Sequence, residues 1–332
     1  TAISAGGGCL KIVEDNNLVS DGMCAGCSLF ASSEMNIILG CCAGNSLAQG
    51  DRNVMIGCGA GKVTTSGAYN VFLNQAGECN QGGGCNTFIG MRAGFKNTSG
   101  CHNHFIGYYA GCNNTTGCCN IGIGRCTLGS SGTALTGESN LAIGTCAGSD
   151  LTTGKQNVFV GSFAGQNSTT GCDNTFVGQY AGGNGIVTGK NNVAVGCKAG
   201  RNITSGCYGV FIGNYAGAGF TTQKFNIAVG CQALGSVTNS SSEKNIAIGA
   251  YAGQHLDASG SGVSNVILIG HCAGYKSHGI NGIAIGQGAA GSDNNKVACN
   301  GIAIGALAGR NLCGDFNISM GFCGGYGSGT VS

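Results

Sequence analysis

Cysteine is the residue type with the greatest chemical potential in this chain, which holds 22 cysteines among its 332 residues. Cys24 and Cys27 form a CxxC pair, a spacing that zinc sites and thiol oxidoreductases use. A zinc site needs a second CxxC or a spaced histidine pair, and a thioredoxin-like site needs a βαβ setting. Neither accompanies Cys24 and Cys27, so we expect no metal ion and no cofactor.

The other groups that could catalyse a reaction are isolated from one another. His102 and His104 flank Asn103, and in a strand their side chains would point to opposite faces, so they cannot share one metal ion. The 13 acidic residues are spread along the chain, whereas a glycosidase needs two carboxyl groups placed together. The chain contains no G-x-S-x-G, HExxH or P-loop motif. The sequence therefore predicts a protein that is not an enzyme.

The composition excludes several further classes of protein. With 67 glycines, no proline and no G-x-y period, the chain cannot form a collagen helix. A hydrophobic fraction of 42% and a net charge of +2 indicate a chain that folds. The basic residues are scattered singly and polar residues interrupt every apolar stretch, so we expect neither nucleic-acid binding nor a membrane span.

An internal repeat organises the chain. The unit is N-[IV]-[AF]-[IV]-G-x-x-A-G followed by about eight polar residues, and the glycine that closes its apolar triplet recurs mostly every 17 residues. Clear copies begin at Asn53, Asn86, Asn157, Asn174, Asn192 and Asn245. About eighteen units fill residues 17 to 327 after an N-terminal segment, 1 to 16, and nothing breaks the series into two domains, so we expect a single domain over 1–332.

The repeat predicts an all-β fold. Triplets of β-branched residues between Gly and Asn are typical of short strands and turns, and 17 residues are too few for a helical hairpin. Each unit is then one coil of a single parallel β-solenoid, or β-roll, of about 18 coils with a period near 17 residues. We expect the motif glycine at a corner with positive φ.

Alternation along the triplet assigns the two faces of each strand. We expect the third residue after the Asn, such as Ile56 or Ile248, to point into the coil. The middle residue would then face outward and form an apolar stripe that another subunit covers. In the alternative, the alternation is inverted and the rings fill the interior. The predicted interface residues are Phe72, Phe88, Phe105, Phe159, Phe176 and Phe211.

Some cysteines recur at one position in consecutive coils. Such residues have Cα atoms roughly 4.8 Å apart, inside the disulfide window of about 4.4 to 6.8 Å. The candidates are Cys41 or Cys42 with Cys58, Cys101 with Cys118, and Cys126 with Cys146. The alternative for any one cysteine is a buried core residue. So many cysteines in a chain with little charge favour an oxidising setting, extracellular or on a cell or virion surface.

A Thr/Ser-rich loop follows each Ala-Gly. The simplest interpretation is a hydrogen-bonded turn that stacks coil on coil. Several loops also contain N-x-[ST], so sugars could decorate one edge of a glycoprotein. The candidate acceptors are Asn97, Asn113, Asn114, Asn167, Asn202 and Asn239, with Asn317 elsewhere in its coil.

The repeat resembles two known families. NTFIGMRAG at 86 and NTFVGQYAG at 174 are similar to the repeats of tail-fibre-domain proteins of bacteria and phages, and to those of trimeric autotransporter adhesin heads. The resemblance covers residues 17 to 327 and implies a β-roll in an extracellular fibre, adhesin or appendage. The chain differs by its longer coil, its cysteines, and the lack of a coiled-coil stalk.

Together these features predict a structural protomer. We expect it to self-assemble into an extracellular filament by end stacking, by lateral apolar contacts or by both, and to be hardened by disulfides. Its partner is then another copy of itself, with surface glycans as a further possibility. The alternative is a surface adhesin or an ice-binding solenoid that uses its threonines, although these threonines lie in turns rather than at T-x-T strand positions.

Overall fold

The computed structural model describes most of the chain. The described residues are 2–5, 8–13, 17–20, 23–29, 33–129, 132–237, 239–256, 262–277, 282–292, 301–312 and 317–326. They form two compact units, residues 1 to 170 and residues 171 to 332, and each unit is described by itself.

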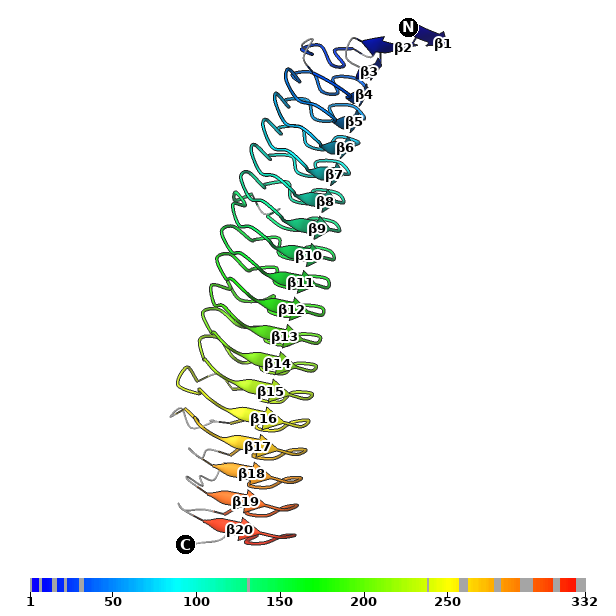
Figure 1. Cartoon of the computed structure of the whole chain (residues 1–332). Coiled ribbons are helices and arrows are strands. Elements are labelled where there is room, and N and C mark those ends of the chain that lie inside the picture. The colour runs from blue at the N-terminus through cyan, green and yellow to red at the C-terminus, as the bar shows by residue number, and fades with distance from the viewer. Residues whose placement is uncertain are drawn as a thin grey trace. The chain divides into compact units, whose positions relative to one another are not determined.

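Both units consist of short strands, one in each coil (Figure 1). Unit 1 contains β1 (Ala2–Ala5), β2 (Gly8–Val13), β3 (Asn17–Ser20), β4 (Ile37–Leu39), β5 (Val54–Ile56), β6 (Val71–Leu73), β7 (Thr87–Ile89), β8 (His104–Ile106), β9 (Ile121–Ile123), β10 (Leu141–Ile143) and β11 (Val158–Val160). Unit 2 contains β12 (Thr175–Val177), β13 (Val193–Val195), β14 (Val210–Ile212), β15 (Ile227–Val229), β16 (Ile246–Ile248), β17 (Ile267–Ile269), β18 (Ile283–Ile285), β19 (Ile302–Ile304) and β20 (Ile318–Met320).

Consecutive coils pair in parallel and in register within each unit. Ala142 of β10 lies opposite Phe159 of β11, 17 residues further on, and Ala194 of β13 lies opposite Phe211 of β14 in the same way. Equivalent residues therefore form straight ranks from coil to coil. The predicted parallel β-solenoid with a period near 17 residues is confirmed.

The first strands of unit 1 depart from this pattern. β1 and β2 pair antiparallel, and β2 pairs antiparallel with β3, with Leu10 opposite Ser20. The parallel series begins with β3 and β4. The outer edge of β3 is therefore occupied by β2, and a coil from another molecule cannot pair there while the hairpin is in place.

The faces of the strands are the reverse of the predicted ones. Phe72, Phe88, Phe105, Phe159 and Phe176 are completely buried, and Phe211 is 2% exposed, so the prediction that these six rings face outward is wrong. Neighbouring rings stack inside unit 1, with the centroids of Phe88 and Phe105 5.2 Å apart. The third residues of the triplets, which were expected inside, instead face outward, as the 39% exposure of Ile56 shows.

The motif asparagine explains this reversal, because it is itself buried. In unit 1 the backbone N–H and the side-chain Nδ2 of Asn53 both donate to Oδ1 of Asn36 in the preceding coil, at 3.0 and 3.1 Å. Nδ2 of Asn53 also donates to the carbonyl of Gly67 at 2.9 Å. Asn192 and Asn174 repeat the arrangement in unit 2. Since the Asn points inward, period-two alternation brings the middle residue of the triplet inside with it.

This ladder makes a testable prediction. Replacing Asn103 by Ala removes the acceptor of the Asn120 N–H and the donor to the Gly117 carbonyl. Two buried polar groups are left unpaired, so we expect a loss of about 2 to 4 kcal/mol in the free energy of unfolding. Urea unfolding measures the effect. Asn45→Ala, which removes only one exposed hydrogen bond, is the control and should cost less than about 1 kcal/mol.

The motif glycine is required by close approach of consecutive coils as well as by its backbone angle. Gly107 has φ +132°, and a Cβ placed on it would lie 2.4 Å from the carbonyl oxygen of Gly124 in the next coil. Any side chain would force these coils apart. The predicted corner glycine with positive φ is confirmed.

Candidate functional site

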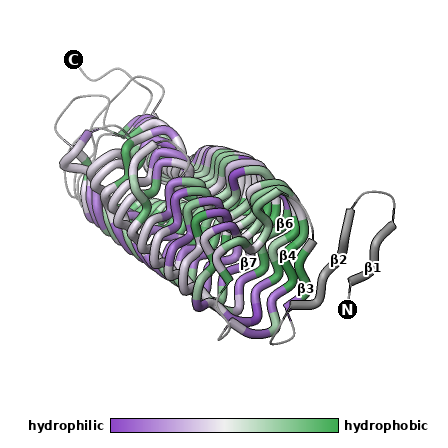
Figure 2. Tube along the Cα trace, turned by 90° about the horizontal axis from the view of Figure 1, so that it is seen from above, coloured by the Kyte–Doolittle hydropathy of each residue, from purple (hydrophilic) through white to green (hydrophobic). Residues whose placement is uncertain are grey.

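The largest surface feature is the outward side of the strands, which we call the apolar face. It consists of the first and third residues of every triplet from β4 to β11 in unit 1 and from β12 to β20 in unit 2. Most of these residues are Val, Ile or Leu, and Figure 2 shows β4 and β6 in the hydrophobic colour. Ile123 in unit 1 is 39% exposed, and Ile212 and Ile248 in unit 2 are 41% and 40% exposed.

Charge is nearly missing from this face. Among its described residues, His104 is the one ionisable group, and Thr87 and Thr175 supply hydroxyls. Exposed Met91 and Tyr108 extend the apolar surface of unit 1 beyond the strand ends. Soluble monomers rarely leave contiguous apolar patches of more than a few hundred Å² in water, so a face of this kind marks an interaction surface.

The spacing of the face is fixed by the fold. Parallel strands in register lie about 4.8 Å apart, so the outward side chains form two regular ranks. The sequence predicted an apolar stripe of this extent but assigned it to the six phenylalanines. The signal that could have found the correct residues was the invariant Asn, whose amide must be satisfied inside the coil.

The described cysteines are present as thiols. In unit 1, Cys101 and Cys118 lie at one position of consecutive coils, and the backbone N–H of Cys101 donates to Sγ of Cys118 at 3.2 Å. Cys126 and Cys146 are also neighbours, and the pKa of Cys146 is raised by burial and by the nearby Cys126. The pKa of Cys41 is raised by Cys42 and, more weakly, by Cys58. Each predicted pair is thus brought together, and its oxidation stays a prediction.

Cysteines two places before the motif Asn have a role that the sequence did not reveal. Each thiol accepts the backbone N–H of the equivalent residue in the preceding coil, as Cys118 does for Cys101 and Cys207 does for Lys190. Ser264 Oγ does the same for the Glu243 N–H in another coil. Any side chain of this size with an acceptor therefore fits the position.

This equivalence separates two substitutions of Cys118. We expect Cys118→Ser to unfold at the wild-type urea concentration under reducing conditions, because the hydroxyl keeps the acceptor. Cys118→Ala should lower the free energy of unfolding by about 1 to 3 kcal/mol, because the Cys101 N–H is left without a partner. Equal stability of the two variants would refute this role.

Three of the predicted glycosylation acceptors are unavailable in the folded chain. Asn97, Asn113 and Asn114 are buried, with exposures of 0%, 4% and 0%. Nδ2 of Asn97 donates to the Gly100 carbonyl, and Nδ2 of Asn114 donates to Oδ1 of Asn97, so these amides form a second interior ladder. The prediction is wrong for these three. The other candidates, Asn167, Asn202, Asn239 and Asn317, are half-buried, and their glycosylation stays a prediction.

The threonine loops are engaged in the predicted turns. Oγ1 of Thr98 donates to the carbonyl of Thr115 at 3.0 Å, and Oγ1 of Thr152 donates to that of Thr169 at 3.1 Å. Thr204 and Thr221 form the same bond in unit 2. Because these hydroxyls bind the next coil, they hold the stack together.

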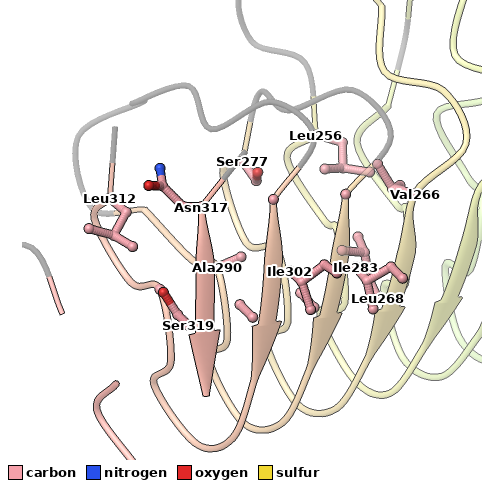
Figure 3. Close-up of a pocket in the computed structure, with 15 residues that line it drawn as sticks. Leu256, Val266, Leu268, Ser277, Ile283, Ala290, Ile302, Leu312, Asn317 and Ser319 are labelled. Carbon is pink, nitrogen blue, oxygen red and sulfur yellow. The ribbon is translucent and has the colours of Figure 1, made fainter. Parts of the chain in front are cut away.

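An apolar pocket lies inside unit 2, where the interior rank changes to the small residues Ala284, Ala303 and Ser319 (Figure 3). Leu256, Val266, Leu268 and Leu312 also line it, and it contains no titratable side chain. It follows from the loss of large side chains in the core.

The searches for metal sites and membrane spans cover the same described residues. There, no group of three or more His, Cys, Asp or Glu side chains is placed to hold a metal ion. No helix in that part of the chain has the length and hydropathy needed to cross a membrane.

The register, the 17-residue period and the asparagine ladder define the class: the chain is a parallel β-solenoid repeat protein. No family model, curated protein or solved structure matches it.

Proposed function

We propose that this chain is a structural protein whose copies assemble side by side through the apolar face into a fibre. The observation that carries the proposal is the face itself: two regular ranks of half-exposed Val, Ile and Leu with almost no charge. Catalysis has no part in the proposal.

The magnitudes favour an extended contact. Burying the remaining two-fifths of an Ile side chain contributes about 1 kcal/mol. The eight triplets from β4 to β11 then offer on the order of 10 kcal/mol. Association costs roughly 4 to 15 kcal/mol, so a few coils would not suffice and a long series of them does.

A second copy is the partner that fits this face best. The ranks repeat at the strand spacing, and another copy presents the same spacing, so its side chains can interdigitate along the whole contact. A partner recognised by charge would find only His104 to pair with on the described face. Lateral contact is also favoured over end stacking because β2 occupies the edge of β3.

The surroundings of the fibre belong to the proposal as well. We place it outside the cell or on a cell or virion surface, since its cysteines lie at bridging positions in consecutive coils and an oxidising setting would join them. The pairs Cys101–Cys118 and Cys126–Cys146 would then harden single chains, and the apolar face would still join the copies.

Sedimentation velocity and negative-stain microscopy of the full chain test the proposal. We expect oligomers or filaments at micromolar concentration, formed with or without reductant and persisting at high salt, because the contact is apolar. Monomers at every concentration would overturn the proposal, and thermal hysteresis from such monomers would support the ice-binding alternative.

A further inference from the structure

Five cysteines from three consecutive coils gather at one corner near the start of unit 1. They are Cys24, Cys27, Cys41, Cys42 and Cys58. The backbone register holds them there: the Cys42 N–H donates to the Met23 carbonyl at 2.8 Å, and the Gly59 N–H donates to the Cys41 carbonyl at 2.8 Å. Cys24 and Cys42 share the left-handed backbone conformation, with φ 57° and 54°. All five thiols are exposed or half-buried, so solutes can reach them.

The closest pair of sulfurs at this corner cannot form a relaxed disulfide. Sγ of Cys41 and Sγ of Cys42 lie 3.7 Å apart. Their residues are adjacent in sequence, and a trans peptide fixes the two Cα atoms about 3.8 Å apart, below the disulfide minimum of about 4.4 Å. Two thiols are therefore held together in a geometry that opposes their direct oxidation to each other.

The same spacing suits a metal ion between the two sulfurs. A metal–sulfur distance of about 2.3 Å gives a linear sulfur–metal–sulfur span of roughly 4.6 Å, so the sulfurs need to separate by about 0.9 Å. Rotation about χ1 of these accessible side chains supplies this movement. Thiolates prefer soft cations such as Cu(I), whereas Mg²⁺ and Ca²⁺ require oxygen ligands.

We propose that Cys41 and Cys42 bind a soft, two-coordinate monovalent cation, with Cu(I) as the probe that defines the class. The reaction is 2 RSH + Cu⁺ → [RS–Cu–SR]⁻ + 2 H⁺, with no change in oxidation state. Cys24, Cys27 and Cys58 flank the pair and can hold further ions once it is filled. Tetrahedral zinc does not fit, because no three potential ligands in the described part of the chain converge on one point.

Protons compete with the metal at this site. Hydrogen bonding to Cys42 and repulsion from its thiolate raise the pKa of Cys41, so the Cys41 thiol is protonated at neutral pH. Both protons must leave when the metal binds. We expect the apparent affinity to rise about 100-fold for each pH unit below the thiol pKa values.

The test uses the reduced full chain, titrated anaerobically with Cu(I) against a chromophoric Cu(I) chelator and followed by native mass spectrometry. We expect the double substitution Cys41→Ser with Cys42→Ser to weaken the first binding event at least tenfold. The control, Cys101→Ser with Cys118→Ser, removes the same number of thiols at a position where Ser264 shows that serine fits, and should bind as the wild type does.

Three outcomes would overturn the proposal: unchanged first binding in the Cys41/Cys42 variant, equal loss in the control, or Zn²⁺ binding of the same stoichiometry that depends on the same pair. Circular dichroism of both variants shows whether each remains folded. The site lies within one chain, so its failure would leave the proposed assembly untouched.

Discussion

Replacing Ile248 and Ile285 by lysine is expected to abolish side-by-side association. Both residues are third in their triplets, 40% and 37% exposed, and lie on the apolar face of unit 2. In an assembled pair of faces each ammonium would be buried among aliphatic side chains with no carboxylate opposite, which costs several kcal/mol per charge. We expect the apparent Kd to rise at least 1,000-fold in sedimentation velocity.

A matched substitution separates this effect from a general gain of charge. Val63→Lys with Ile186→Lys also replaces two exposed aliphatic residues, 37% and 65% exposed, but these lie outside the strand triplets. We expect this control to assemble as the wild type does, and both variants to keep the wild-type circular dichroism spectrum. Assembly of the Ile248/Ile285 variant at wild-type concentration would exclude the apolar face as the interface.

The second large effect concerns the interior of unit 1. Phe105 is completely buried, and its ring stacks on that of Phe88 with centroids 5.2 Å apart. In the next coil the equivalent residue is Gly122, so no neighbouring side chain of that rank can move into the space left by the ring. We expect Phe105→Ala to lower the free energy of unfolding by about 3 to 5 kcal/mol in urea unfolding.

Tyr108→Ala is the control for this prediction. Tyr108 lies in the same coil but is 45% exposed, so its removal should cost less than about 1 kcal/mol. If the alternation along the triplet were the one that the sequence suggested, Phe105 would be the outward residue and its truncation would be nearly neutral. Equal stability of the two variants would therefore contradict the burial described above.

The repeat period and the fold class could be determined from the sequence. Gly and Asn at fixed 17-residue intervals around β-branched triplets leave a short strand and a tight corner as the physically sensible coil, and identical coils stack in parallel. The existence of an uncharged apolar stripe followed from composition, because so few charges cannot cover every face. The pairs of cysteines in consecutive coils followed from the period alone.

The tertiary structure decided which side of each strand is inside. The triplet is apolar at all three places, so hydrophobicity could not choose between the two alternations, and the deciding residue was the polar Asn in front of it. Asn36 and Asn53 are stable in the interior because each amide is satisfied by the next coil. Burial of Asn97 and the approach of Cys41 to Cys42 likewise depend on hydrogen bonds and register between coils, which no single repeat contains.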